Sequence, residues 1–350
     1  MALSTILITG ATGVVGSALV QQVRHRDVVC LLHRDRRLAN DVVSVTGDLC
    51  ASGLGLAPRD RAALQARTTH VVHCAAMTDF KRPAAEIHAT NLEATRNILD
   101  FAAAADARVL HLSTAFVGRD DAAAAGLEAL GKHNEWSEGI VAYVRSKQEC
   151  ERLVLESGLP VSIARPSLVV GDSRTGAISR FQGVHMLMSF VFKGELPLLP
   201  VPADTLVDFL PQDVLARALV SILDLEAPRS AYWLTAGTQA ATLQRLLDLI
   251  VDFAAAMGSP VNHPKLVDPD LIDRLIRPVF LDGLPEALRR RFELMLALVC
   301  LYQRQDAFPS CIEDVLGDAA ADLRLENAFG VGMEYWAREQ GLGDVAAVRS

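Results

Sequence analysis

The sequence predicts an α/β fold in which a parallel sheet is covered by helices. Two observations carry this prediction: short β-branched runs alternate with helical patterns through the first half, and the runs are nearly all apolar. Such alternation is typical of parallel strands joined by crossover helices, and apolar strands are expected where both faces are covered. The expected strands are Ile6–Thr9, Val28–Leu32, Val42–Val45, Val71–Cys74, Val109–Ser113 and Val161–Ala164, and the expected helices between them are Val14–Val23, Arg59–Ala66, Ala84–Ala105 and Ile140–Ser157. Six strands in this order indicate a Rossmann-like, doubly wound sheet.

Helical patterns dominate after Arg165-Pro166. Expected helices there are 178–191, Val214–Leu225, Leu243–Met257 and Glu286–Gln303, with strands only at Leu206–Phe209 and Tyr232–Thr235. We therefore expect a Rossmann domain over residues 1–171 and a smaller, mainly helical substrate-binding region over 172–350. Residues 204–225 are expected to return to the Rossmann core. A length of 350 residues agrees with two modest domains.

Composition excludes several classes of function. The 42 acidic residues exceed the 34 basic ones, giving a charge of −8, which argues against nucleic acid and anionic membranes as partners. The six cysteines form no C-x-x-C pair, so neither a metal site nor a disulfide framework is expected. No basic segment precedes the first apolar run, and the run Leu294–Tyr302 is too short to span a bilayer. The expected location is the cytoplasm.

A glycine-rich turn follows the first expected strand and opens the first helix. Its spacing is G-x-x-G-x-x-G, and its residues are Gly10, Thr12, Gly13, Val14, Val15 and Gly16. Glycines let the backbone approach a pyrophosphate, and the free N–H groups at a helix start attract its charge. The alternative interpretation is a tight strand-to-helix connection. The glycine-rich turn stands at the first βα junction, which favours a dinucleotide site.

The second strand predicts which dinucleotide binds. No acidic residue ends this strand to hold a ribose hydroxyl, and Arg34 follows it instead. A guanidinium group suits a 2′-phosphate, and the span 24–37 holds five Arg against two Asp. The alternative is a solvated arginine-rich loop, but the preceding glycine turn favours NADPH. Asp48, after the third strand, is a candidate acceptor for the adenine amino group.

Tyr143 and Lys147 lie four residues apart, on one face of the helix between the fifth and sixth strands. A tyrosine donates a proton to a carbonyl oxygen only if its anion is stabilised, and a lysine ammonium does this. Chance pairs of this spacing are common, so the position on the helix carries the argument. A hydroxyl at the tip of the fifth strand would hold the same oxygen, and Ser113 and Thr114 both qualify. They point to opposite faces, so only one can serve.

Together these motifs resemble an extended short-chain dehydrogenase/reductase, and within it the branch of fatty acyl-CoA reductases and thioester reductases. The resemblance is dense over about residues 5–215. It rests on Thr9-Gly10-x-x-Gly13-x-x-Gly16, Gly47-Asp48-Leu49 with Leu54-Gly55-Leu56, His73-Cys74-Ala75-Ala76-Met77-Thr78-Asp79-Phe80, Asn91-Leu92-Glu93-Ala94-Thr95-Arg96, Leu112-Ser113-Thr114-Ala115-Phe116-Val117, Tyr143-x-x-x-Lys147 and Arg165-Pro166-Ser167-Leu168-Val169-Val170-Gly171.

The resemblance implies the remaining roles. It favours Thr114 over Ser113 as the catalytic hydroxyl. It also implies that Asn91 holds a water molecule that relays protons. It adds cofactor contacts at Leu49, Cys74, Ala75, Ala76 and Pro166, besides Tyr143 and Lys147. The implied reaction is NADPH-dependent reduction of an acyl-CoA or carrier-bound thioester to an aldehyde, with the further step to an alcohol left open. The implied assembly is a homodimer.

Two other functions are compatible with part of this pattern. The first is an NADP-dependent reductase or epimerase of the same extended type, acting on a ketone, a steroid or a sugar nucleotide. Arg34 and Leu54-Gly55-Leu56 argue moderately against it. The second is a dinucleotide-sensing protein without catalysis. It is disfavoured because Thr114, Tyr143 and Lys147 are all present. A covalent role for Cys74 is discounted, since it follows a buried strand with no evident base.

Overall fold

The structure is a computed structural model, and it describes residues 5–33, 38, 42–118, 135–202, 204–267, 283–304, 306–320 and 323–342. Its centre is a seven-stranded parallel sheet with the order β11-β6-β5-β4-β1-β2-β3. The strands are β1 (Thr5–Thr9), β2 (Val28–His33), β3 (Val43–Gly47), β4 (Thr68–His73), β5 (Arg108–Leu112), β6 (Val161–Pro166) and β11 (Ala231–Leu234). The predicted Rossmann-like α/β class is confirmed.

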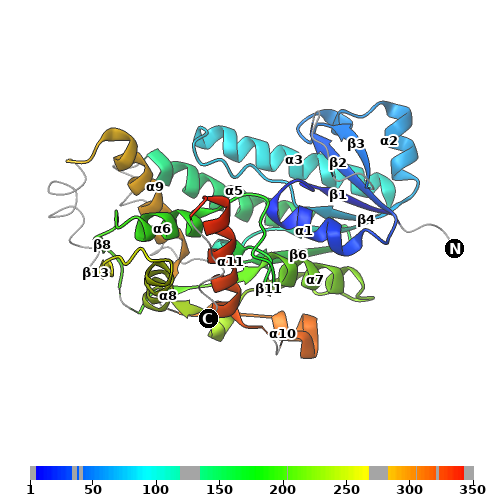
Figure 1. Ribbon diagram of the computed structural model, residues 1–350. Coiled ribbons are helices and arrows are strands. Elements are labelled where there is room, and N and C mark those ends of the chain that lie inside the picture. The colour runs from blue at the N-terminus through cyan, green and yellow to red at the C-terminus, as the bar shows by residue number, and fades with distance from the viewer. Residues whose placement is uncertain are drawn as a thin grey trace.

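Helices cover the sheet in two layers (Figure 1). One layer contains α1 (Val14–Val23) and α7 (Gln212–Leu223), and the other contains α2 (Pro58–Gln65), α3 (Ala84–Ala105) and α5 (Glu135–Glu156). Side chains alternate between the two faces of a strand. In β1, Ile6 and Ile8 accordingly join the apolar cluster around α1 and α7, while Leu7 joins the one around α3.

The strand order reverses at β1, which has β2 on one side and β4 on the other. In sheets of this kind a ligand binds beyond the carboxyl ends of the strands at the reversal, because the following loops diverge there. The segments after β1 and β4 begin at Gly10 and Cys74. The topology therefore places both at the expected crevice.

The two edges of the sheet differ from the sequence prediction. Three of the five residues of β3 are exposed, and Val43 reaches 55%, so this strand is not covered on both faces. It pairs only with β2 and lies at the edge. The opposite edge is β11, which comes from beyond residue 171 and pairs in parallel with β6. Long intervening helices hide this pairing from the sequence pattern.

The remaining elements build a helical lobe on the carboxyl side of the sheet. Its helices are α6 (Gly183–Phe192), α8 (Leu243–Ala256), α9 (Glu286–Tyr302), α10 (Ile312–Leu316) and α11 (Leu325–Glu339). Its short strands are β7 (Leu168–Val170), β8 (Leu198–Leu199), β9 (Leu206–Val207), β10 (Phe209–Pro211), β12 (Ala241–Thr242), β13 (Lys265–Leu266) and β14 (Gln303–Arg304), and its 3-10 turns are 237–239 and 317–320. The 3-10 turns 52–55 and 115–118 follow β3 and β5. Helix α7 packs on α1, and Arg26 pairs with Asp224 at 2.7 Å.

Two further sequence expectations can be compared with these elements. Helix α5 begins at Glu135, five residues before the expected start at Ile140. Among the described helices, none combines the length and apolar composition that a membrane span requires.

Candidate active site

The glycine-rich turn joins β1 to α1 with an exposed, uncapped helix start. Gly10 has φ +70°, a conformation that glycine adopts at little cost. Its carbonyl oxygen accepts a hydrogen bond of 2.9 Å from the N–H of Gly13. Gly13 is the N-cap residue, no side chain caps the helix, and no acidic residue occupies its first turn. The N–H groups of Val14, Val15 and Gly16 are therefore available to an anion. This arrangement fits the pyrophosphate of a dinucleotide.

The segment after β4 packs directly against this turn. A Cβ atom added to Gly10 would come within 2.6 Å of the nitrogen of Ala75, so only glycine allows the close approach. Thr9 fixes the contact, because its Oγ1 accepts a hydrogen bond from the N–H of Ala75 at 3.2 Å. The structure thus brings Cys74, Ala75 and Ala76 to the edge of the predicted cofactor site. Burial raises the pKa of Cys74 to about 12, so its thiol is not a nucleophile at neutral pH.

Tyr143 and Thr114 meet at the carboxyl end of β5. Their hydroxyl groups lie close together, and the Thr114 hydroxyl acts to lower the pKa of Tyr143. Thr114 is buried, follows the last strand residue by two positions, and starts the turn 115–118. The ring of Phe80 packs edge-on against Tyr143 with centroids 5.6 Å apart. A carbonyl oxygen placed between the two hydroxyls would receive two hydrogen bonds.

Lys147 lies one helical turn below Tyr143 and is buried. Its Nζ donates to the carbonyl oxygen of Leu112 at 2.7 Å, and burial lowers its pKa. Burial also raises the pKa of Tyr143 to about 12, against a lowering by the Thr114 hydrogen bond. The phenol is therefore protonated at neutral pH and able to donate.

Asn91 shapes the loop after β4. Its Oδ1 accepts from the N–H of Met77 at 2.6 Å, and its Nδ2 donates to the carbonyl oxygen of Met77 at 3.3 Å and to Oγ of Ser146 at 2.9 Å. Ser146 in turn donates to the carbonyl oxygen of Tyr143 at 2.7 Å. The amide thus connects the cofactor-side loop to the catalytic helix. The relay water implied by the family resemblance stays a prediction.

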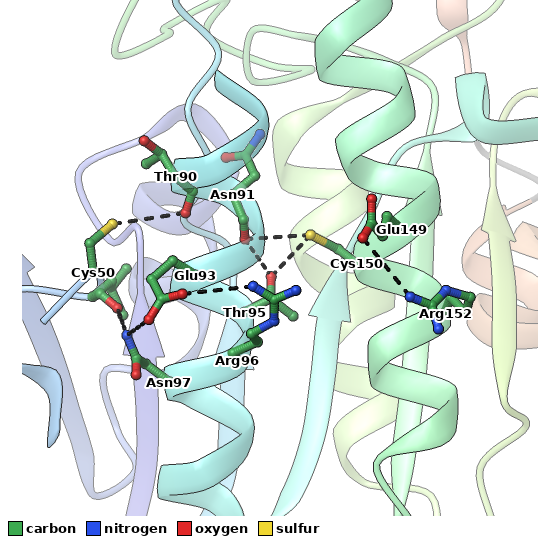
Figure 2. Close-up of polar contacts among 11 residues, drawn as sticks. Cys50, Thr90, Asn91, Glu93, Thr95, Arg96, Asn97, Glu149, Cys150 and Arg152 are labelled. Atoms are coloured by element: carbon green, nitrogen blue, oxygen red, sulfur yellow. Dashed lines mark hydrogen bonds and ion pairs between the residues drawn. The ribbon is translucent and has the colours of Figure 1, made fainter. Parts of the chain in front are cut away.

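A buried polar seam fixes α3 against α5 just below Asn91 (Figure 2). The Thr95 hydroxyl lies 2.8 Å from the carbonyl oxygen of Asn91 and 3.2 Å from Sγ of Cys150. Cys150 also lies 3.4 Å from the carbonyl oxygen of Asn91. Cys150 and Val154 are buried and follow Lys147 at helical spacing along α5. This seam sets the position of the catalytic pair along the sheet.

Pro166 ends β6 and is buried beside two hydroxyls without partners. The Oγ atoms of Ser113 and Ser167 are buried and make no hydrogen bond among the described residues. Because these two oxygen atoms have almost no accessible surface, they belong to the packed interior between β5 and β6, and the contact of Pro166 with the cofactor stays a prediction.

Sequence reasoning gave no role to two buried histidines under the site. His73 ends β4 and faces His111, the last residue but one of β5, and their ring centroids are 5.4 Å apart. Burial lowers the pKa of His73 to about 3 and that of His111 well below its usual value, and Lys147 adds to both effects. Both rings are therefore neutral at pH 7. Their position at the tips of buried strands, where histidine is uncommon, was the available signal.

The remaining predicted cofactor residues are Thr12, Arg34, Asp48 and Leu49. Asp48 and Leu49 follow β3; Oδ1 of Asp48 accepts from the N–H of Cys50 at 2.9 Å, and the carbonyl oxygen of Leu49 accepts from Asn97 at 2.8 Å. Arg34, the predicted ligand of the 2′-phosphate, lies outside the described residues. Thr12 is half-buried beside the glycine turn. The assignment of these residues to the cofactor stays a prediction.

Comparison with known families decides the class of this site. The family model described as male sterility protein, an NAD-binding model, matches residues 23–219, which is more than half of the chain. The chain belongs to the male sterility protein family. The predicted resemblance to extended short-chain dehydrogenases/reductases is thereby confirmed, and residues 23–219 match an NAD-binding domain of this family.

Similar proteins include large biosynthetic enzymes. The hybrid PKS-NRPS synthetase poxE of Penicillium oxalicum is 29% identical over 238 residues, a stretch covering 61% of this chain and 6% of the synthetase. This chain therefore spans a small part of that relative. The terminal R domain from the myxalamid PKS-NRPS pathway has a similar fold, with a TM-score of 0.73 and 22% identity over 97% of this chain and 92% of that one. A thiolation-reductase di-domain from an archaeal non-ribosomal peptide synthetase gives 0.67 and 15%, over 97% and 76%.

Proposed function

We propose that this male sterility family protein reduces an acyl thioester with NADPH and releases an aldehyde and a thiol. The observation that carries the proposal is the approach of Thr114 to Tyr143, one helical turn from buried Lys147, at the strand ends that face the glycine turn. This arrangement presents two donors to one carbonyl oxygen, where negative charge develops as the carbon is reduced.

The residues of the chain would act in sequence on that oxygen. Thr114 and Tyr143 hold and polarise the carbonyl, and a bound nicotinamide supplies the hydride. Tyr143 then gives its proton to the oxygen, and Lys147 stabilises the tyrosinate. The resulting hemithioacetal breaks its C–S bond, leaving aldehyde and thiol, and Tyr143 regains a proton from solvent. One hydride and one proton are consumed for each aldehyde formed.

A thioester is favoured over a ketone by the relatives and by the lobe above the site. The similar proteins are PKS-NRPS and non-ribosomal peptide synthetases, and one similar structure joins a thiolation domain to a reductase. We infer that the thiol carrier is a thiolation domain or coenzyme A. An apolar cavity of about 30 Å³ opens between α6, α8 and α9, with Leu168, two residues after Pro166, in its wall. It suits a small apolar part of the acyl group.

The test is a panel of acyl-CoA thioesters, carrier-bound thioesters and ketones incubated with NADPH, with nicotinamide absorbance and free thiol followed together. Thioester turnover with one NADPH consumed per thiol supports an aldehyde product, and a ratio of two would show reduction to the alcohol. Turnover of ketones without any thioester would contradict the proposal.

The preference for NADPH has its own test, because it rests on Arg34. Arg34→Ala is expected to weaken NADPH binding at least about tenfold, since a charge-assisted hydrogen bond contributes about 1.5–3 kcal/mol. NADH binding should change little. The matched control is Arg67→Gln, an exposed arginine at the end of α2. Equal weakening of both dinucleotides would place the 2′-phosphate elsewhere.

A further inference from the structure

A second polar cavity lies away from the glycine turn and the catalytic pair. Its volume is about 250 Å³, and it opens between the loop after β7, helix α7 and the start of α11. Three arginines line it, Arg174 from the loop, Arg217 from α7 and Arg324 from the N-cap of α11. Within the described residues, none of the three guanidinium groups makes an ion pair or a hydrogen bond.

The loop that carries Arg174 is fixed in place. Oδ1 of Asp172 accepts from the N–H groups of Arg174 at 3.1 Å and Thr175 at 2.9 Å. Asp213, in the first turn of α7, accepts from the N–H and the hydroxyl of Ser173, both at 2.8 Å. Arg174 therefore projects from a rigid support, and binding a ligand there costs little ordering of the backbone.

Three arginines gather at this cavity in an otherwise acidic protein of charge −8. The acidic side chains beside them have other partners: Glu326, in the first turn of α11, pairs with Arg245 at 2.7 Å, Asp213 accepts hydrogen bonds from Ser173, and Asp172 accepts from backbone N–H groups of its own loop. Among the described residues no side chain caps α11, so its first N–H groups add partial positive charge.

We propose that this cavity binds a phosphate group. Planar guanidinium groups give forked, charge-assisted hydrogen bonds to phosphate oxygens, and three of them surround this space. The volume is below that usual for a whole drug-sized ligand, so it suits a phosphate or diphosphate group better than a complete dinucleotide. The side-chain amide of Asn327, which also lines the cavity, is a further donor.

The phosphate could come from two sources that share this chemistry. One is a free phosphate compound, such as pyrophosphate. The other is the phosphate of the substrate's pantetheine arm, an assignment that rests on the proposed thioester function. The loop 171–177 begins at the end of β7, five residues after Pro166, which makes the second source compatible with the chain's course.

The first experiment needs no turnover. Pyrophosphate is titrated calorimetrically into the protein with the dinucleotide site saturated by NADPH or, separately, by NADH. Arg217→Gln and Arg174→Gln are each expected to weaken binding at least tenfold, while Arg67→Gln leaves it unchanged. Because the replaced groups have no partners in the described structure, thermal melting should stay within about 2 °C of the wild type. Absence of binding in the wild type, or equal binding in all variants, would overturn the proposal.

The second experiment separates the two sources. KM and kcat are measured for one acyl group on phosphopantetheine and on pantetheine that lacks the phosphate. If the cavity holds the pantetheine arm, Arg217→Gln raises KM for the phosphorylated thioester about tenfold and leaves the other KM and both kcat values unchanged. If only pyrophosphate binding is lost, the ligand is a free phosphate compound. Failure of both thioesters to react would contradict the proposed function and leave the titration result standing.

Discussion

At the scale of single residues, the site depends on groups whose protonation is set by burial. Burial raises the pKa of Tyr143 to about 12, so it enters the reaction protonated. The Lys147 ammonium group helps to lower the pKa values of His73 and His111. Neither property is visible in the residue types alone, because an exposed tyrosine and lysine at the same spacing would have ordinary pKa values.

Replacing Tyr143 tests the proton donor. Tyr143→Phe is expected to lower kcat at least about 10²-fold, the low end for general acid catalysis, and to leave dinucleotide binding nearly intact. The control is Tyr232→Phe, a buried tyrosine whose hydroxyl accepts from the N–H of Arg229 instead. It should alter stability rather than rate. Unchanged turnover in Tyr143→Phe would remove this residue from the mechanism.

Gly10 tests the close approach of the cofactor turn to β4. Gly10→Ala combines a left-handed backbone with a Cβ atom 2.6 Å from the nitrogen of Ala75. Gly158→Ala has a similar φ of +73° but open space around the added atom. We expect the control to cost about 1–2 kcal/mol of stability with normal dinucleotide binding. Gly10→Ala should cost more and weaken the dinucleotide; equal effects in urea unfolding and fluorescence titration would show that the contact is irrelevant.

At the scale of elements, one buried ion pair ties the catalytic helix to the strand that carries Pro166. Glu151 on α5 binds Arg165 on β6 through two contacts, at 2.9 and 2.5 Å. The guanidinium group also lies 4.9 Å from the ring centre of Trp233 on β11. The Arg165 side chain thus connects α5, which carries Tyr143 and Lys147, to β6 and β11.

Breaking this pair should loosen that connection. Glu151→Gln is expected to lower the free energy of unfolding by about 3 kcal/mol, the low end for a buried pair because Arg165 keeps 21% of its side chain exposed. Glu149→Gln, two residues earlier on the same helix, is the matched control. Its partners His88 and Arg152 are exposed, so it should cost at most about 1 kcal/mol. Figure 2 shows the contact with Arg152. Urea unfolding measures both, and equal losses would contradict the role of burial.

At the scale of the whole molecule, buried neutral histidines link stability to pH. Burial lowers the pKa of His73 to about 3, of His185 to about 4, and of His111 well below its usual value. In the unfolded chain these groups titrate near 6.5. Because the folded-state pKa is depressed, the stabilisation is fully present above pH 6.5. It is lost as the pH falls toward the folded-state values.

Acid sensitivity should therefore depend on these side chains. Each contributes at most about 1.4 kcal/mol per pH unit below 6.5. His111→Phe is expected to flatten the loss of stability between pH 7 and 5. It should be nearly neutral at pH 7, because neither ring nitrogen of His111 has a hydrogen-bond partner among the described residues. Urea unfolding at both pH values gives the comparison, and an unchanged pH slope would contradict this origin.

The sequence alone was enough for most of the Rossmann sheet. Its first six strands and the helices between them were predicted because buried parallel strands and amphipathic helices leave local periodic patterns. The motifs were enough to find the family, since the glycine turn and the Tyr143–Lys147 spacing each satisfy a local geometric need. Local patterns could not show that β3 is exposed, or that β11 joins the sheet from beyond residue 171. Strand neighbours are set by long-range packing.

Only the tertiary structure decided what meets at the site and beyond it. It joined Thr114 to Tyr143, turned Asn91 toward Met77 and Ser146, and placed His73 and His111 beneath Lys147. It also brought Arg174, Arg217 and Arg324 to one cavity, although the first and the last are 150 residues apart in the chain. Sequence determines which side chains are available and on which local face they stand. Their convergence, burial and altered pKa values arise only when distant segments exclude water together.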